Sequence, residues 1–318
     1  MLDVNRLRVL VAVARTGSVT GAARELHYSQ PSISHHLARL EAETGAKLVQ
    51  RAGRGIRLTE AGGLLAERGA EILGRLDAAS AELAAHVGLQ QGRVRLAAFP
   101  SALGTFVPLA AARLATDHPG LELRLVETEP PEALRMLRAG LVDVAVIFRY
   151  DDDHPEDEGI RTRFLMADPT YLVTPSLVTP AGEGAETGLL GLASHRDGHW
   201  IAGCERCRIH LLEMCAAAGF QPRVSYTTDD YVAVQALVAA RLGVTTLPGL
   251  ALSAARNPGV RASELADSAR YVSAATYGEP PDPPATTALI EALALAALGH
   301  DPAAAAVPRR TTAARGSR

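Results

Sequence analysis

The sequence predicts a multidomain protein with an all-α head, a long connecting helix and a two-lobed α/β body. Three observations support this division. Residues 1–58 contain three helical apolar patterns, and residues 59–91 form one further helical pattern with apolar positions at alternating four- and three-residue steps. From residue 92 onward, short strand patterns alternate with helical ones, which is typical of an α/β domain.

The composition is that of an ordinary globular chain of 318 residues, with 47% apolar and 21% charged residues. No apolar run reaches the ~18–20 residues that a membrane helix needs. The N-terminal apolar run at residues 9–14 is shorter than the core of a signal peptide. All three cysteines fall between residues 204 and 215, so they do not form a framework of secretory disulfides. We therefore expect a cytoplasmic protein that does not enter a membrane.

The net charge of −3 is unevenly distributed along the chain. Residues 1–58 hold nine Lys or Arg against four Asp or Glu, whereas the rest of the chain holds 23 against 31. A basic head on an acidic body suggests that the head alone meets a polyanion. The imbalance is small enough to arise by chance, so charge alone does not establish this partner.

Turn and cap residues delimit the helices expected in the head. Gly17 is placed to end the first helix, and Ser18 or Thr20 to cap the second. Ser29 can cap a third helix whose first turn contains Pro31, where proline is tolerated. Proline thus starts this helix and does not break it.

The first turns of the third helix expose small polar side chains. Because nothing bulky blocks this end, it can enter a DNA major groove about 12 Å wide. Gln is suited to bond adenine edges, Ser and His can reach bases or phosphates, and the free N–H groups favour a phosphate nearby. The alternative is an ordinary surface helix. The side chains concerned are Gln30, Ser32, Ser34 and His35.

Residues 47–51 and 56–59 alternate like two short strands around a glycine-containing turn, and Arg51, Arg54 and Arg57 lie on this hairpin. A hairpin with arginines beside a recognition helix is the winged helix-turn-helix arrangement. In that arrangement the wing binds backbone phosphates.

The head also carries many residue types at fixed spacings over about sixty positions. These are Gly17-Ser18, Ala22-Ala23, Leu26, Ser29-Gln30-Pro31, Ser34, Leu40-Glu41, Gly45, Leu48, Arg51, Leu58-Thr59 and Ala61-Gly62. The pattern resembles the N-terminal domain of LysR-type transcriptional regulators. Val49 stands where that family usually has Phe, and His35-His36 stand where Arg or Gln are common, which leaves the base preference open.

The residues and the resemblance together predict double-stranded DNA as a partner. The side chains that we expect at the DNA are Ser18, Thr20, Ser29, Gln30, Pro31, Ser32, Ser34, His35, Arg39, Arg51, Arg54 and Thr59.

The connecting segment, residues 59–91, has a narrow apolar stripe suited to one partner helix. We do not expect so narrow a stripe to fold back on its own domain, so we predict a homodimer formed by this helix, as the resemblance also implies. The alternative is a helix that packs on the next domain. The stripe consists of Leu65, Gly69, Ile72, Leu76, Ala79 and Leu83.

The order of strands and helices in the body predicts right-handed crossovers and a mainly parallel sheet. We expect one lobe from residues 92–165 and 268–300 and a second from residues 166–267. Crossovers near residues 149–166 and 265–271 would join them. With the segments "LVDVAVI", "AAAGFQP" and "LVAARLGVTTLP", this order resembles the periplasmic-binding-protein-like effector domain of the same family.

In such a body a ligand binds between the lobes, outside the carboxyl ends of strands. Ser101 begins a helix and is suited to hold a carboxylate, as is Arg149 unless it pairs with the acids that follow it. We therefore expect a small-molecule effector, with carboxylates as candidates. The residues predicted to bind it are Pro100, Ser101, Ala102, Thr128, Phe148, Arg149, Gly203, Cys204, Thr227, Thr228 and Pro248.

Arg241 stands just after a helix, where the family usually has glycine. Since a left-handed backbone would cost Arg about 1 kcal/mol, we expect this turn to be built differently.

The segment "GCERCRIHLLEMC" leaves several alternatives open. Its Cys and His residues are of the right types for zinc, but Cys215 falls nearly two helical turns beyond Cys207, so we expect no metal. Cys204 and Cys207 could instead form a redox pair at a strand-to-helix junction, where neighbouring arginines lower a thiol pKa. The remaining alternative is reduced thiols, with Cys215 as a small buried hydrophobe.

Two other classes of protein are suggested by parts of the body, but neither accounts for the head. "WIAGCERC" weakly resembles a thioredoxin-like oxidoreductase site, and the body alone would suit a secreted solute-binding protein. The sequence has no P-loop, nucleophile elbow or metalloprotease helix, so we expect no enzyme and no cofactor.

The prediction is a LysR-like regulator, dimeric or tetrameric, whose effector changes DNA bending or contact with RNA polymerase. Residues 301–318 are predicted to form a disordered tail.

Overall fold

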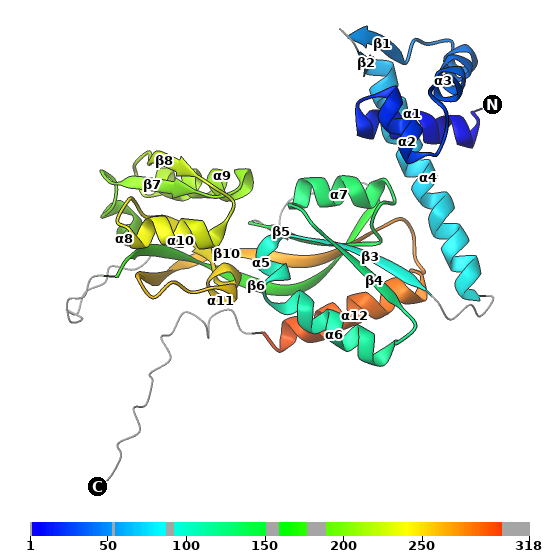
Figure 1. Cartoon of the computed structure of the whole chain (residues 1–318). Coiled ribbons are helices and arrows are strands. Elements are labelled where there is room, and N and C mark those ends of the chain that lie inside the picture. Colours follow the sequence, from blue (N-terminus) through cyan, green and yellow to red (C-terminus); the bar gives the residue numbers. More distant parts are fainter. Residues whose placement is uncertain (1, 53–54, 87–91, 151–158, 177–188, 301–318) are drawn as a thin grey trace.

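The computed structural model describes residues 2–52, 55–86, 92–150, 159–176 and 189–300. A small head, a long helix and a body of two lobes follow one another along the chain (Figure 1). The predicted tail at residues 301–318 lies outside the described residues.

The predicted capping residues bound the helices of the head. Gly17 ends α1 with a φ of 66°. The hydroxyl of Ser18 accepts the Gly21 N–H at the start of α2, and that of Ser29 accepts the Ser32 N–H at the start of α3. The elements are α1 (Val4–Thr16), α2 (Val19–Glu25), α3 (Gln30–Thr44), β1 (Val49–Ala52) and β2 (Gly55–Leu58).

One apolar core holds the head together. Leu10, Ile33 and Leu40 are completely buried in it, and Leu48 joins it just before the hairpin. The strands β1 and β2 pair antiparallel, with Val49 opposite Leu58. Because the apolar face of α3 is buried, its polar face is turned to the outside of the molecule.

The long helix α4 (Glu60–His86) contacts both the head and the body. Its first turns pack on α1: Ala66 is buried in the head core, and Gly69 lies against Leu7 and Val11. Further along, Gly74 meets Gly140 of the body so closely that a Cβ on Gly74 would lie 2.6 Å from the Gly140 backbone. The expectation that this helix would not fold back on its own domain is therefore wrong for its first half.

The second half of the predicted stripe on α4 is exposed in the single chain. Leu65 and Gly69 are used within the head, but Ile72, Leu76 and Leu83 have large exposed apolar side chains. A stripe of this kind on one side of a helix is suited to a partner helix.

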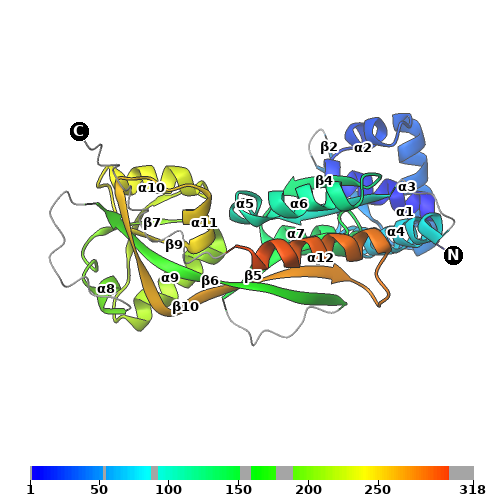
Figure 2. The same cartoon turned by 90° about the horizontal axis from the view of Figure 1, so that it is seen from below.

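The body contains one continuous six-stranded sheet in the order β4-β3-β5-β10-β6-β9. Two long strands, β6 (Ile160–Pro175) and β10 (Val260–Tyr277), run through both lobes (Figure 2). They pair antiparallel with each other, and β10 also pairs antiparallel with β5. The prediction of a mainly parallel sheet is thus wrong for these strands, because one carries the chain into the second lobe and the other carries it back. The later of the two predicted crossovers is not a loop but part of β10, at an irregularity in its register with β6.

The first lobe has helices on both faces of its parallel strands. The α6 and α12 helices pack together over one face, and α7 covers the other (Figure 1). Its elements are β3 (Arg93–Ala98), α5 (Pro100–Leu103), α6 (Phe106–Asp117), β4 (Glu122–Glu127), α7 (Pro130–Arg138), β5 (Val144–Arg149) and α12 (Pro284–Leu298).

The second lobe is built around Trp200, which is completely buried. Its strands β7 and β8 pair in parallel, and Trp200 also bridges to Val244. The elements of this lobe are α8 (Leu189–Ala193), β7 (His199–Ala202), α9 (Glu205–Ala217), β8 (Arg223–Thr227), α10 (Tyr231–Ala239), β9 (Thr245–Pro248) and α11 (Gly249–Ala254).

The turn after α10 contradicts the sequence expectation. Arg241 takes a φ of 62°, so it occupies the left-handed region itself. Its N–H donates to the Val238 carbonyl and that of Leu242 to the Leu237 carbonyl, which closes the helix. The turn keeps a geometry that suits glycine and strains arginine.

Candidate nucleic-acid interface and effector cleft

The amino end of α3 is exposed, as the sequence predicts. Pro31, Ser34 and His35 are exposed, Ser32 is half-buried, and Ile33 on the opposite side is completely buried. The buried isoleucine therefore anchors the first turn while the polar residues around it remain accessible.

A hydrogen bond joins the amino end of α3 to α2. The side-chain amide of Gln30 donates to the Thr20 hydroxyl at 3.0 Å, and both residues are exposed. Its side-chain carbonyl oxygen stays available for another donor. Ser18 and Ser29 use their hydroxyls to cap α2 and α3, and Arg39 is exposed further along α3.

The arginines of the hairpin lie on different faces of it. Arg51 is opposite Ile56, and Arg57 is opposite Gln50. Because side chains alternate along a strand, Arg51 and Arg57 project to opposite faces. Arg54 lies outside the described residues.

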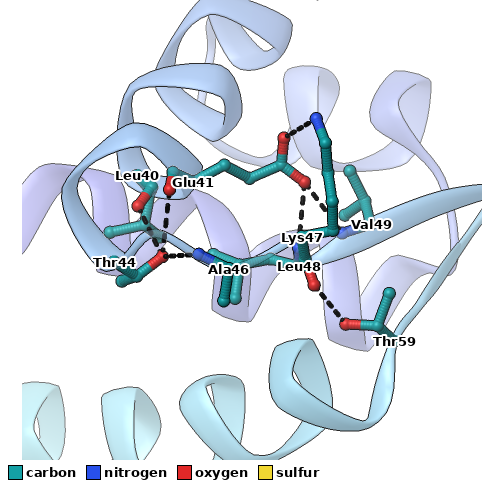
Figure 3. Close-up of polar contacts among 8 residues, drawn as sticks. All are labelled: Leu40, Glu41, Thr44, Ala46, Lys47, Leu48, Val49 and Thr59. Atoms are coloured by element: carbon teal, nitrogen blue, oxygen red, sulfur yellow. Dashed lines mark hydrogen bonds and ion pairs between the residues drawn. The ribbon is translucent and has the colours of Figure 1, made fainter.

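Glu41 ties α3 to the base of the hairpin (Figure 3). One carboxylate oxygen accepts the N–H groups of Leu48 at 2.9 Å and Val49 at 3.3 Å, and the other accepts the Lys47 ammonium at 2.8 Å. Burial raises the pKa of Glu41, but the bonds from Lys47 and the two N–H groups outweigh it and leave the pKa below its usual value. The ionised carboxylate therefore fixes the hairpin relative to the recognition helix.

Thr59 holds the other strand of the hairpin. Its hydroxyl donates to the Lys47 carbonyl at 2.6 Å (Figure 3). The same hydroxyl accepts the Gly62 N–H at 3.0 Å. The structure thus places this residue, predicted at the DNA, in bonds within the protein that cap α4 and close the hairpin.

A cleft that is partly open to solvent lies between the two lobes. Several predicted effector-binding residues line it: Pro100, Ser101, Phe148, Gly203, Cys204, Thr228 and Pro248.

Four predicted residues do not line the cleft. Ala102 is buried in the core of the first lobe, and Thr227 is exposed at the end of β8. The Thr128 N–H is bonded to the Ala98 carbonyl beside the cleft. Arg149 stands between two lining residues at the end of β5, where alternate side chains project to opposite faces.

The cleft also contains residues that the sequence analysis missed. One of them is Arg270 on β10, which is only 2% exposed. Nothing in the local sequence marks it, because its partners lie more than a hundred residues away. The missed lining residues are Phe99, Glu129, Tyr150, Thr170, Cys207, Asp229, Tyr231, Val234, Thr246, Leu247, Ala251 and Arg270.

Arg270 is held by a buried ion pair and by aromatic rings. Its Nε donates to Asp168 Oδ2 at 2.8 Å and its Nη2 to Ser101 Oγ at 2.7 Å. The rings of Phe99 and Phe148 lie 4.7 and 4.4 Å from its guanidinium carbon. Burial lowers the pKa of Arg270, but Asp168, together with Tyr150 and Cys207, more than offsets this, so the guanidinium stays charged.

Two cysteines of the cleft are close together. The Cys204 and Cys207 sulfurs are 3.0 Å apart, and the Tyr150 hydroxyl lies 3.5 Å from Cys207 Sγ. The hydrogen bond from Cys204 is the main cause that lowers the pKa of Cys207 to about 7, and the same pairing raises the pKa of Cys204. Cys215 is completely buried in the second lobe, where burial raises its pKa to about 12. Among the described residues, no group of three or more His, Cys, Asp or Glu is arranged to hold a metal ion.

Both parts of the chain match known protein families. Residues 4–63 match the bacterial regulatory helix-turn-helix proteins of the lysR family, and residues 88–297 match the LysR substrate binding domain. The chain therefore belongs to the LysR family of transcriptional regulators. These two matches support neither of the other classes considered from the sequence, a solute-binding protein and a thioredoxin-like oxidoreductase.

Individual relatives match this chain over most of their own length. The chain is 30% identical over 285 residues to the HTH-type transcriptional regulator TfdS of Cupriavidus pinatubonensis, covering 87% of this chain and 92% of TfdS. It is also 30% identical over 282 residues to a probable hydrogen peroxide-inducible genes activator of Mycobacterium avium, covering 80% and 85% of the two chains. Full-length CbnR in complex with its target DNA has a similar fold, with a TM-score of 0.61 at 23% identity over 93% of this chain and 100% of CbnR.

Proposed function

We propose that this LysR-family regulator reads its operator with the amino end of α3 and senses a small molecule in the cleft between its lobes. The observation that carries the proposal is the exposed first turn of α3, bonded to α2 through Gln30 and flanked by a hairpin with Arg51 and Arg57. An uncluttered helix end with phosphate-binding groups beside it fits major-groove readout. The solved CbnR complex contains DNA, which supports DNA as the partner.

The proposed dimer forms through the exposed part of α4. Ile72, Leu76 and Leu83 would pack against the same residues of a second copy, which would place two heads on one duplex. A regulator of this kind acts where DNA and RNA polymerase are, so we place it in the cytoplasm and infer no enzymatic activity. Among the described residues, no helix is long and apolar enough to span a membrane.

The proposed signal is a change in the arrangement of the lobes. They are joined by the long strands β6 and β10, and the cleft takes residues from both lobes. An effector that binds one arrangement more tightly would shift the population toward it. Since Gly74 of α4 packs on Gly140 of the first lobe, that shift would reach the helix that carries the heads.

The operator assignment can be tested on DNA that co-purifies with the protein. Sequencing it yields an operator, and the Arg51→Ala variant is then titrated with the operator and with a scrambled duplex at several salt concentrations. We expect weaker binding to both duplexes and a salt slope that is flatter by about one unit. Unchanged binding on both duplexes at every salt concentration would contradict the role of the hairpin.

A second candidate function is supported by the cysteine pair. The thiolate of Cys207 would attack a hydroperoxide, breaking the O–O bond to give a sulfenic acid and an alcohol or water. The thiol of Cys204, 3.0 Å away, would then displace water to form a disulfide. Thiol titration before and after peroxide, with operator affinity measured in both states, tests this function. An affinity that does not change on oxidation removes it.

A further inference from the structure

The positive charge in the cleft is already compensated. Arg270 is paired with Asp168 at 2.8 Å and bonded to Ser101, and Asp168 also accepts the Leu250 N–H at 2.9 Å. Two opposite charges in contact present little net charge to a third group. A carboxylate entering the cleft would therefore find no uncompensated cation among the lining residues that the structure describes.

Two acidic side chains, Glu129 and Asp229, line the cleft. Glu129 comes from the first lobe, and its Oε2 is buried without a hydrogen-bond partner among the described residues. Asp229 comes from the second lobe and is exposed at the cleft. Burial raises the pKa of Glu129, and Arg270, a hydrogen bond with Cys204 and, to a smaller extent, Arg206 oppose this. Arg206 is itself engaged, since its Nη1 donates to the Phe148 carbonyl. The lobes thus each contribute one acid to the cleft.

A second acceptor in the cleft also lacks a partner. Thr170 is only 3% exposed and lines the cleft, and its hydroxyl oxygen has no hydrogen-bond partner among the described residues. A buried polar group without a partner costs about 1–3 kcal/mol, so such groups in a binding site indicate the polar atoms of a ligand. An ionised carboxylate only accepts and a threonine hydroxyl can accept, so both groups fit a ligand that donates hydrogen bonds.

Part of the lining on the second lobe is apolar. Val234, Leu247, Pro248 and Ala251 are buried and belong to the second lobe. A ligand that fits this cleft therefore combines a donor-rich head with an apolar remainder.

We propose that the effector is an organic cation of the primary-amine class, whose ammonium group is bound between Glu129 and Asp229 and whose apolar remainder lies on the second lobe. This inference rests on the proposed function, in which the cleft holds the effector. An ammonium group offers three donors and no acceptor, which matches carboxylates and an acceptor hydroxyl. Because the acids come from different lobes, one ammonium group between them stabilises the arrangement of the lobes that brings the two acids together.

The cysteines of the cleft allow a test without knowledge of the natural ligand. Reduced full-length protein is treated with a methanethiosulfonate that carries a trimethylammonium group and, separately, with its sulfonate counterpart. The modification rates of Cys204 and Cys207 are each divided by the rate for free 2-mercaptoethanol. We expect the cationic reagent to be favoured by about tenfold or more, because acids that line a cleft concentrate cations there.

Variants and small probes sharpen the test. Glu129→Gln combined with Asp229→Asn removes both charges at nearly unchanged volume. The ratio of the two normalised rates, cationic reagent over anionic reagent, should then fall toward one. Glu132→Gln is the matched control, since Glu132 lies on α7 in a surface ion pair with Arg135. Benzylamine should slow the modification more than benzoate at equal concentration, and this difference should vanish in the double variant.

The outcomes separate the two proposals. A preference for the anionic reagent, better protection by benzoate, or a ratio unchanged in the double variant overturns the amine class. If operator binding persists in that case, the regulator function stands. Failure of the unmodified protein to bind any co-purified DNA sequence overturns the proposed function, whatever the reagent ratio.

Discussion

The head and the cleft differ in how far apart in the sequence their residues lie. At the head, the residues from Ser18 to Thr59 form one local unit, and Glu41 reaches the hairpin across only seven or eight positions. In the cleft, Arg270 bonds Asp168 and Ser101 across 102 and 169 positions. A local unit can be recognised from spacing, whereas a site assembled from distant strands depends on how the chain returns to itself.

The ion pair of the cleft gives the largest expected effect. Arg270→Met should lower the free energy of unfolding of the body by about 3–5 kcal/mol, because it leaves Asp168 buried and unpaired. The fluorescence of Trp200, the only tryptophan, reports the transition in urea. Combining Arg270→Met with Asp168→Leu should recover most of the loss. Equal destabilisation of the single and double variants would show that lost packing, and not the unpaired charge, is responsible.

The next effect concerns specificity at the head. Gln30→Ala should weaken binding to the operator by about 1–3 kcal/mol and leave binding to a scrambled duplex almost unchanged. Fluorescence anisotropy with both duplexes measures the difference. Thr20→Val removes the hydroxyl that accepts the Gln30 hydrogen bond but leaves the Gln30 side chain in place. This variant therefore separates the effect of positioning Gln30 from the effect of its contact with a base. Equal losses on both duplexes would contradict base readout by Gln30.

A smaller effect is expected where α3 meets the hairpin. Since the pKa of Glu41 is lowered in the folded protein, its stabilisation is present above the usual value of 4.5 and is lost as the pH falls through the folded value. Glu41→Gln should cost about 1 kcal/mol at neutral pH and remove this part of the acid sensitivity. Hydrogen exchange of the Leu48 and Val49 amides is the measurement. Protection that does not change in the variant would contradict the anchoring role.

The smallest effect, and the only stabilising one, concerns the turn after α10. Arg241→Gly should raise the free energy of unfolding by about 0.5–1 kcal/mol, because glycine adopts a φ of 62° without strain. Urea denaturation followed at Trp200 measures it. Arg223→Gly, at an exposed strand residue of the same lobe, should destabilise and serves as the control. A lower stability for Arg241→Gly would mean that contacts of the side chain outweigh the strain.

The sequence predicted the structure correctly where the helical spacing of apolar residues and the capping residues indicate the same helix bounds. Gly17, Ser18 and Ser29 bound the helices as predicted, and the exposed end of α3 followed from them. It failed for the direction of the body strands, since β6 and β10 look like any other strand until their antiparallel pairing is seen. It also missed Glu129 and Thr170, because an isolated Glu before a proline or a Thr within a strand carries no local signal of a ligand.

The sequence by itself determined the family, the division into head, helix and body, and the polar end of α3. Those features depend on interactions between near neighbours in the chain, such as caps, turns and helical spacing. Only the tertiary structure decided that α4 packs on α1, that Arg270 is neutralised by Asp168, and that Glu129 lines the cleft with one carboxylate oxygen lacking a hydrogen-bond partner among the described residues. The charge that a ligand meets is a sum over groups brought together by folding, and no stretch of sequence contains that sum.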